Sequence, residues 1–222
     1  MGKQTHFNAM TSGLALRCAV IAFACLAVFP RVAPAAASPP ATELLAALQK
    51  GGYVLVMRHA QSPDARPAPR DAEADNGADE RQLSADGKAS AQALGVALRA
   101  LHVPIGRVYC SPTYRTRETL RLAGFARPQI IPELGETPAG MQAKAGSAQT
   151  SWLQQAVRRA PMRNTDTLIV THAPNIAAAF GSEDGKLQAG EMLIFQPAAH
   201  GAAGRRIGSL TIGQWEQLTP SR

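Results

Sequence analysis

Two strand-like segments place the strongest constraint on the fold of this chain. Residues 53–57 (YVLVM) form a continuous apolar run, which is typical of a strand buried on both faces of a parallel sheet. Residues 166–171 (DTLIVT) are the clearest strand pattern in the chain. Stretches with helical spacing of leucine and alanine stand around them, for example residues 41–50 and the segment behind Ser84, a candidate N-cap. Strands that alternate with helices predict an α/β fold, a three-layer α/β/α sandwich with a mostly parallel central sheet.

The remaining elements follow from the same patterns. We expect further strands at 107–110 and 129–134, helices at 113–123 and 140–160 and from 175, and a closing hairpin of 191–197 with 209–218. Residues 61–82 are polar, with three prolines and many acids. Loops this long inside a compact domain tend to be functional or mobile, so this excursion is expected to influence specificity.

The first residues have a different character. Lys3 and Arg17 form a basic start without nearby acids, residues 18–29 are a short apolar run, and small residues lead to a cleavage site at Ala37. This is the pattern of a secretory signal peptide, and the run is shorter than the roughly 20 residues of a membrane span. We therefore expect residues 1–37 to be removed and the protein to be periplasmic or secreted. The alternative is an uncleaved anchor.

Residues 38–222 then form one domain. Removal of the signal segment would take away three of the 23 basic residues and none of the 16 acids, leaving a net charge of +4 instead of +7. Much of the basicity is therefore targeting signal, and no nucleic-acid partner is expected. Only Cys110 of the three cysteines lies in the mature part, so an internal disulfide is excluded there, and the thiol spacings of structural zinc sites are absent.

Four polar residues stand where predicted strands end. Arg58 and His59 follow 53–57, Arg115 follows 107–110, and His172 follows the strand at 166–171. Each alone is more often structural. In a parallel sheet, however, the carboxyl ends of the strands line one crevice, and two guanidinium groups with two imidazoles suit a phosphate dianion.

Four segments carry a family resemblance. They are VLVMRHAQS, RQLSADGKASAQALG, CSPTYRTRET and VTHAPNI, which begin at residues 54, 81, 110 and 170. They resemble, in order, the R-H-G/A, R-x-L-[ST]-x-x-G, S-P-x-x-R-[TA]-x-x-T and V-x-H-x-x-x-I segments of the histidine phosphatase superfamily, branch 1. The resemblance implies a phosphoglycerate mutase-like fold.

The resemblance also implies roles. His59 would be the nucleophile that forms a phosphohistidine, and Arg58, Arg115 and His172 would bind the phosphate. A neutral imidazole nitrogen is nucleophilic near pH 7, and the two arginines with a protonated His172 would stabilise the transferring group. No metal and no cofactor are expected.

The proton donor for the leaving group is less clearly specified. Glu136 fits the place of the family's general acid, although the G-x-x-E-G tail that usually follows is missing, and Glu133, Asp64 or no acid at all are the alternatives. Ser62 is expected either to donate its hydroxyl to the phosphate or to cap the turn.

The function expected from these residues is hydrolysis of phosphate monoesters through a phosphohistidine, outside the cytoplasm. The substrate would be a phosphorylated small molecule or glycan, and no stable membrane anchor would remain after cleavage. Two alternatives stay open. One is a phosphohistidine or phosphoprotein phosphatase, and the other is a catalytically silent phosphate-binding module on the same scaffold.

Overall fold

The structure is a computed structural model that describes residues 38–76, 78–136, 146–198 and 204–220. The described residues all belong to one compact unit, Ala37–Arg222. The predicted signal segment, residues 1–37, lies outside the described residues. Within the described part of the chain, no helix is long and apolar enough to cross a membrane.

The described residues contain one six-stranded sheet. Its strands are β1 (Val54–Arg58), β2 (Ile105–Cys110), β3 (Gln129–Ile130), β4 (Asp166–Thr171), β5 (Met192–Gln196) and β6 (Arg205–Leu210), in the order β3-β2-β4-β1-β5-β6. The first four strands of this order are mutually parallel, whereas β5 runs antiparallel to both β1 and β6. The prediction of a mostly parallel sheet is therefore confirmed.

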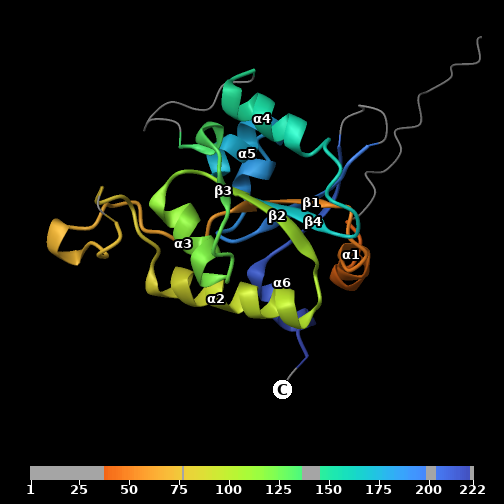
Figure 1. The fold of residues 1–222 in the computed structure, drawn as a ribbon, viewed down its shortest axis with the longest axis horizontal. Coiled ribbons are helices and arrows are strands. Elements are labelled where there is room, and N and C mark those ends of the chain that lie inside the picture. The colour runs from red at the N-terminus through yellow and green to blue at the C-terminus, as the bar shows by residue number, and fades with distance from the viewer. Residues whose placement is uncertain (1–37, 77, 137–145, 199–203, 221–222) are drawn as a thin grey trace, which may run out of the picture. The chain divides into compact units, whose positions relative to one another are not determined.

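Helices cover both faces of the sheet (Figure 1). They are α1 (Ala41–Leu48), α2 (Ala85–Ala100), α3 (Tyr114–Leu122), α4 (Ala148–Ala156), α5 (Ala173–Phe180) and α6 (Ile212–Leu218), with short 3₁₀ turns at Pro69–Asp71, Pro132–Leu134 and Asp184–Lys186. Side chains alternate along a strand, so Leu55 and Met57 of β1 join the core under α1, α2, α3 and α6. Val54 and Val56 join the core under α4 and α5. The three-layer sandwich is confirmed.

The structure corrects the predicted end of the chain. β5 and β6 form the expected antiparallel pair, but β6 ends at Leu210 and a helix, α6, follows it. Thr211 and Gln214 form a capping box, in which each side chain hydrogen-bonds the backbone N–H of the other residue, a strong helix-start signal. Because this cap fixes a helix, Trp215 is buried against the core. The predicted strand over 209–218 is wrong beyond Leu210.

Two other boundaries differ from the prediction. Helix α4 begins behind the N-cap Ser147, and residues 140–145 of the helix expected over 140–160 lie outside the described residues. The expected strand at 129–134 is short because Pro132 starts a 3₁₀ turn directly after β3.

The buried carboxyl of Asp166 generates a stability prediction. Oδ1 accepts a hydrogen bond from the backbone N–H of Tyr53 at 2.8 Å, and Oδ2 is buried without a partner among the described residues. Burial raises the pKa of Asp166 from 3.8 to about 7 because it penalises the charged form. The folded state therefore binds this proton more tightly than the unfolded state does, and stability falls as the pH rises from about 4 to about 7.

We expect Asp166→Asn to raise the free energy of unfolding at pH 8, since the amide keeps the acceptor and removes the buried charge. The gain should shrink as the pH is lowered toward 4. Urea unfolding at pH 8 and pH 5 measures both effects, with the exposed Asp64 changed to Asn as the control. A gain that is the same at both pH values would contradict this account.

Candidate active site

The topology of the sheet brings the candidate residues together. Strands β1 and β2 both pair in parallel with β4, so the residues that follow these three strands meet at one edge of the sheet. Arg58 is the last residue of β1, and the next residue, His59, donates its backbone N–H to the carbonyl of Thr171 at 3.0 Å. His172 follows β4 directly. The imidazole rings of His59 and His172 lie 5.3 Å apart, centroid to centroid.

Hydrogen bonds specify the tautomer of His59. The Nδ1 atom lies 2.7 Å from the carbonyl oxygen of Ala60, to which it can only donate, and Nε2 accepts a hydrogen bond from Nε of Arg115 at 3.1 Å. Burial lowers the pKa of His59 from 6.5 to about 3, opposed in part by the Ala60 hydrogen bond and reinforced by the charges of Arg115 and Arg58. The ring is therefore neutral, with its proton on Nδ1 and its lone pair on Nε2.

His172 takes the opposite tautomer. Its Nδ1 accepts a hydrogen bond from Nη2 of Arg115 at 3.0 Å, so Nε2 carries the proton and donates to Oγ of Ser111 at 2.9 Å. Burial and then the positive charge of Arg115 lower the pKa of His172 well below its usual value. His172 is therefore neutral in the free protein, because an imidazolium here would be desolvated and would face a guanidinium. The protonated His172 expected during phosphoryl transfer stays a prediction.

Arg115 connects the cluster. It lies in the first turn of α3, within the helix predicted over 113–123, and its side chain is 2% exposed. Its Nε donates a hydrogen bond to His59, and its Nη2 donates to His172. The same Nη2 lies 2.7 Å from Oε1 of Glu136. A planar group with fixed donors can hold three partners in one geometry, so Arg115 determines how the two imidazoles and the carboxylate lie relative to one another.

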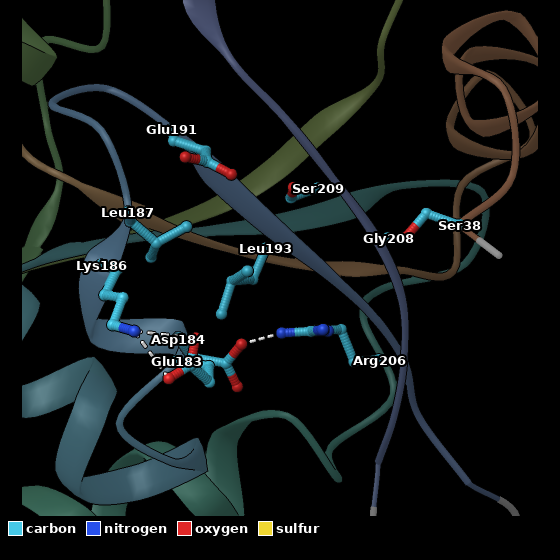
Figure 2. A pocket seen from close by; sticks show the side chains of 10 residues that line it. All are labelled: Ser38, Glu183, Asp184, Lys186, Leu187, Glu191, Leu193, Arg206, Gly208 and Ser209. Carbon is cyan, nitrogen blue, oxygen red and sulfur yellow. Dashed lines mark hydrogen bonds and ion pairs between the residues drawn. The ribbon is translucent and has the colours of Figure 1, made fainter. Parts of the chain in front are cut away.

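Arg58 is held by the segment that follows α5. Its Nη1 donates to the backbone carbonyl of Leu187 at 2.7 Å, and its other N–H groups have no hydrogen-bond partner among the described residues. Figure 2 shows Leu187 on the segment that follows α5, where an ion pair between Asp184 and Arg206 links this segment to β6. One donor of Arg58 is therefore anchored while the others remain available for a ligand.

The pocket drawn in Figure 2 is a poor phosphate site. It has a volume of about 140 Å³, and its lining includes the acids Glu183, Asp184 and Glu191. Lys186 and Arg206 also line it, but each already forms an ion pair with one of these acids, Lys186 with Glu183 and Arg206 with Asp184. A dianion would meet uncompensated negative charge here, so the arginine-rich side at the ends of β1 and β4 is the better candidate.

Of the three acids considered as proton donors, only Glu136 pairs with a member of the cluster. Its side chain is 42% exposed, and Oε1 lies 2.7 Å from Nη2 of Arg115 and 3.7 Å from Nη1 of Arg81. Asp64 is exposed and pairs with Arg81 at 3.1 Å, whereas Glu133 lies in the 3₁₀ turn before Glu136. Residues 137–140, which replace the usual family tail, lie outside the described residues.

Ser62 is held by the loop itself. Its hydroxyl donates to the carbonyl of Gln82 at 2.6 Å, which joins the two ends of the 61–82 excursion. A hydroxyl has one proton to donate, so the phosphate contact expected of Ser62 requires this bond to be given up. That role stays a prediction.

Comparisons with known proteins bear on the family. The model of the histidine phosphatase superfamily (branch 1) matches residues 54–145. The match supports placing this chain in that superfamily. It covers the segments that carry Arg58, His59 and Arg115, and His172 lies beyond it. No curated protein matches the sequence.

Solved structures match as well. The protein histidine phosphatase SixA in complex with tungstate is 20% identical, with a TM-score of 0.52 over 72% of this chain and 97% of that chain. At this identity the likeness shows the fold alone, which is the fold expected of the superfamily. A mycobacterial glucosyl-3-phosphoglycerate phosphatase in complex with VO3 is 15% identical, with a TM-score of 0.49 over 70% of this chain and 97% of that chain. A phosphoserine phosphatase variant from Entamoeba histolytica in complex with phosphoserine is 12% identical, with a TM-score of 0.47 over 73% and 98%.

Several supporting residues were not predicted, although each stands in one of the segments that resemble the superfamily. Thr119 accepts a hydrogen bond from the backbone N–H of Ala60 at 3.2 Å and so supports the turn behind His59. The side-chain amide of Asn175 donates to the carbonyls of Leu134 and Gly135, each at 3.0 Å, and so fixes the backbone just before Glu136.

Arg81 is the other omission. It pairs with Glu136 and Asp64, and its positive charge contributes to the low pKa values of His59 and His172. Arg81 is the first residue of the R-x-L-S segment, and this position could have marked it as a candidate site residue.

The tautomers generate a prediction for spectroscopy. In the free protein, the ¹⁵N chemical shifts of the His59 ring should show a protonated Nδ1 and an unprotonated Nε2 from pH 8 down to about pH 4. Only below that should the ring titrate, since the pKa of His59 is lowered to about 3. Long-range ¹H–¹⁵N correlation spectra measure this, with the exposed His102 as an internal reference. A His59 midpoint near 6.5 would contradict the described burial and hydrogen bonding.

Proposed function

We propose that this protein is a phosphatase that hydrolyses phosphate monoesters through a phosphohistidine on His59, without a metal ion, and that it acts outside the cytoplasm. The observation that carries the proposal is the state of His59. Its Nδ1–H is bound by the Ala60 carbonyl, and the lone pair on Nε2 points at Arg115. A neutral imidazole with one nitrogen held by a backbone carbonyl is a nucleophile in a fixed orientation.

The chemistry begins with an exchange of hydrogen bonds. In the free protein, the Nε–H of Arg115 occupies the Nε2 lone pair of His59. An arriving phosphate takes over the donors of Arg115, because a charge-assisted bond to a phosphate oxygen is stronger than a bond to a neutral imidazole. Nε2 is then free to attack the phosphorus atom, while Arg58 and Arg115 stabilise the charge on the equatorial oxygens. The Nε2–P bond forms as the P–O bond to the leaving group breaks.

The remaining steps concern protons. The leaving alkoxide needs a proton, and Glu136 is the acid that lies within reach of Arg115. Water then attacks the phosphorus atom of the phosphoenzyme and gives its proton to the Glu136 carboxylate, which restores the acid. The N–P bond breaks with its electrons returning to Nε2, and inorganic phosphate is released. The negative charge of the bound phosphate also favours a protonated His172, which the free protein disfavours.

One observation favours the phosphohistidine or phosphoprotein phosphatase. In the free protein, Oε1 of Glu136 already accepts a hydrogen bond from Arg115 and lies near Arg81, an arrangement that suits a carboxylate more than a proton donor. Imidazole is a better leaving group than an alkoxide and makes fewer demands on an acid. The proposed export argues for the ester substrate, and assays with both substrate kinds decide between them.

Turnover tests the proposal against the silent phosphate-binding module. We expect p-nitrophenyl phosphate to be hydrolysed at a rate that EDTA does not change, and His59→Ala to lower kcat by several orders of magnitude. Arg115→Ala should lower kcat/KM by about 10²–10³-fold, as expected for a lost oxyanion donor. His102→Asn is the matched control, because His102 is an exposed histidine with φ 54°, a conformation that Asn tolerates. Loss of activity with EDTA, or none in the wild type, would contradict the proposal.

The role of Glu136 has its own test. Glu136→Gln should slow alkyl phosphates by about 10²–10⁴-fold and p-nitrophenyl phosphate far less, because a general acid matters in proportion to the basicity of the leaving oxygen. Steady-state kinetics with both substrates measure the difference. Equal effects on the two substrates would exclude Glu136 as the acid.

Export is tested on the protein in its own cell. We expect the extracytoplasmic fraction to contain a chain that begins near Ser38, and intact-mass spectrometry identifies that end. A protein that kept residues 1–37 would contradict cleavage.

A further inference from the structure

A second pocket lies beside the buried cluster and shares Arg115 and Glu136 with it. It has a volume of about 480 Å³, within the size range of small-molecule sites, and Arg66, Arg81 and Arg115 are among its lining residues. Arg115 belongs to the proposed phosphate site, so this pocket is where the rest of a bound substrate would lie.

The charges in this pocket are unevenly compensated. Glu136 pairs with both Arg115 and Arg81, and Oε2 of Glu80 accepts the backbone N–H of Tyr114 at 2.7 Å. Arg66 is exposed and has no ion pair or hydrogen bond among the described residues, although acids are frequent on its own loop. One guanidinium is therefore free to bind a ligand at the rim.

The loop that carries Arg66 is anchored to the domain. The side chain of Asn76 bonds both the backbone N–H and the carbonyl of Glu80, at 3.0 and 2.7 Å. The hydroxyl of Tyr114, in α3, lies 2.6 Å from Oδ1 of Asp75 and also contacts Glu73. The Tyr114 bonds fasten residues 73–75 to the same helix that carries Arg115. On the other side of Arg66, Nε of Arg81 donates to the carbonyl of Pro63 at 2.7 Å, so the loop is held to the domain both before and after Arg66.

We propose that Arg66 binds a second anionic group of the substrate, and that the site therefore selects small molecules that carry a carboxylate or a second phosphate in addition to the phosphate that is transferred. The inference rests on the proposed function, because Arg115 marks the end of the pocket where the transferred phosphate binds. Guanidinium recognises carboxylate and phosphate through the same planar pair of donors, and the two kinds of anion are separated by the choice of substrates.

The test compares matched substrates. O-phosphoserine and O-phosphoethanolamine differ by one carboxylate, and glucose 1,6-bisphosphate and glucose 6-phosphate differ by one phosphate. In at least one pair, the wild-type kcat/KM should be about tenfold higher for the doubly anionic member, as expected for one charge-assisted hydrogen bond. Arg66→Ala should bring this ratio close to one, and Arg66→Glu should bring it below one. Arg70→Ala is the matched control, because Arg70 lies on the same loop, is exposed and does not line the pocket. It should leave the ratio unchanged.

The outcomes separate the two proposals. If p-nitrophenyl phosphate is hydrolysed through His59 but neither pair shows a preference that depends on Arg66, the proposed function stands and the role of Arg66 is overturned. If no substrate is turned over, calorimetric binding of the same pairs to the wild type and to Arg66→Ala still decides. Tighter binding of the doubly anionic member that is lost in Arg66→Ala supports the inference, and equal binding or no binding overturns it.

Discussion

The candidate site depends on the hydrogen bonds that the guanidinium of Arg115 makes with its neighbours. This guanidinium is almost completely buried, and its bonds to His59, His172 and Glu136 run from a single rigid plane. A buried cation with unsatisfied donors would be costly, so the neutral imidazoles and the carboxylate also stabilise Arg115. Burial does most to lower the pKa values of both imidazoles, and the charge of Arg115 lowers them further. Arg115 therefore fixes the orientation of the two rings and contributes to their neutral state.

The sheet explains why these residues can meet at all. β1, β4 and β2 are parallel neighbours, so segments separated by more than a hundred residues in the chain end at one edge. The supporting contacts come from the elements that follow: Thr119 of α3 bonds Ala60, and Asn175 of α5 holds the backbone before Glu136. The 61–82 excursion adds Arg81 and Arg66, so the loop and the scaffold together line the outer pocket.

The sequence predicted what depends on short-range pattern. The segments 53–57 and 166–171 are central strands of the sheet, and the convergence of Arg58, His59, Arg115 and His172 follows from parallel strands. A strand over 209–218 was predicted as part of a closing hairpin, whereas the capping box of Thr211 and Gln214 fixes a helix. The neutral state of His172 depends on burial, and the pairing of Arg81 with Glu136 depends on the path of an irregular loop. Neither the protonation state of His172 nor this ion pair leaves a periodic pattern in the sequence.

The central claim is that Nε2 of His59 becomes phosphorylated during turnover, and trapping the phosphoenzyme tests it most directly. A reaction with labelled substrate, quenched within milliseconds, should yield phosphate on the peptide that contains His59, in a bond that is labile to acid and stable to base. Because the Ala60 carbonyl holds Nδ1, ³¹P spectroscopy of the isolated peptide should show attachment at Nε2. Label on His172 or on a serine, or attachment at Nδ1 of His59, would contradict the account.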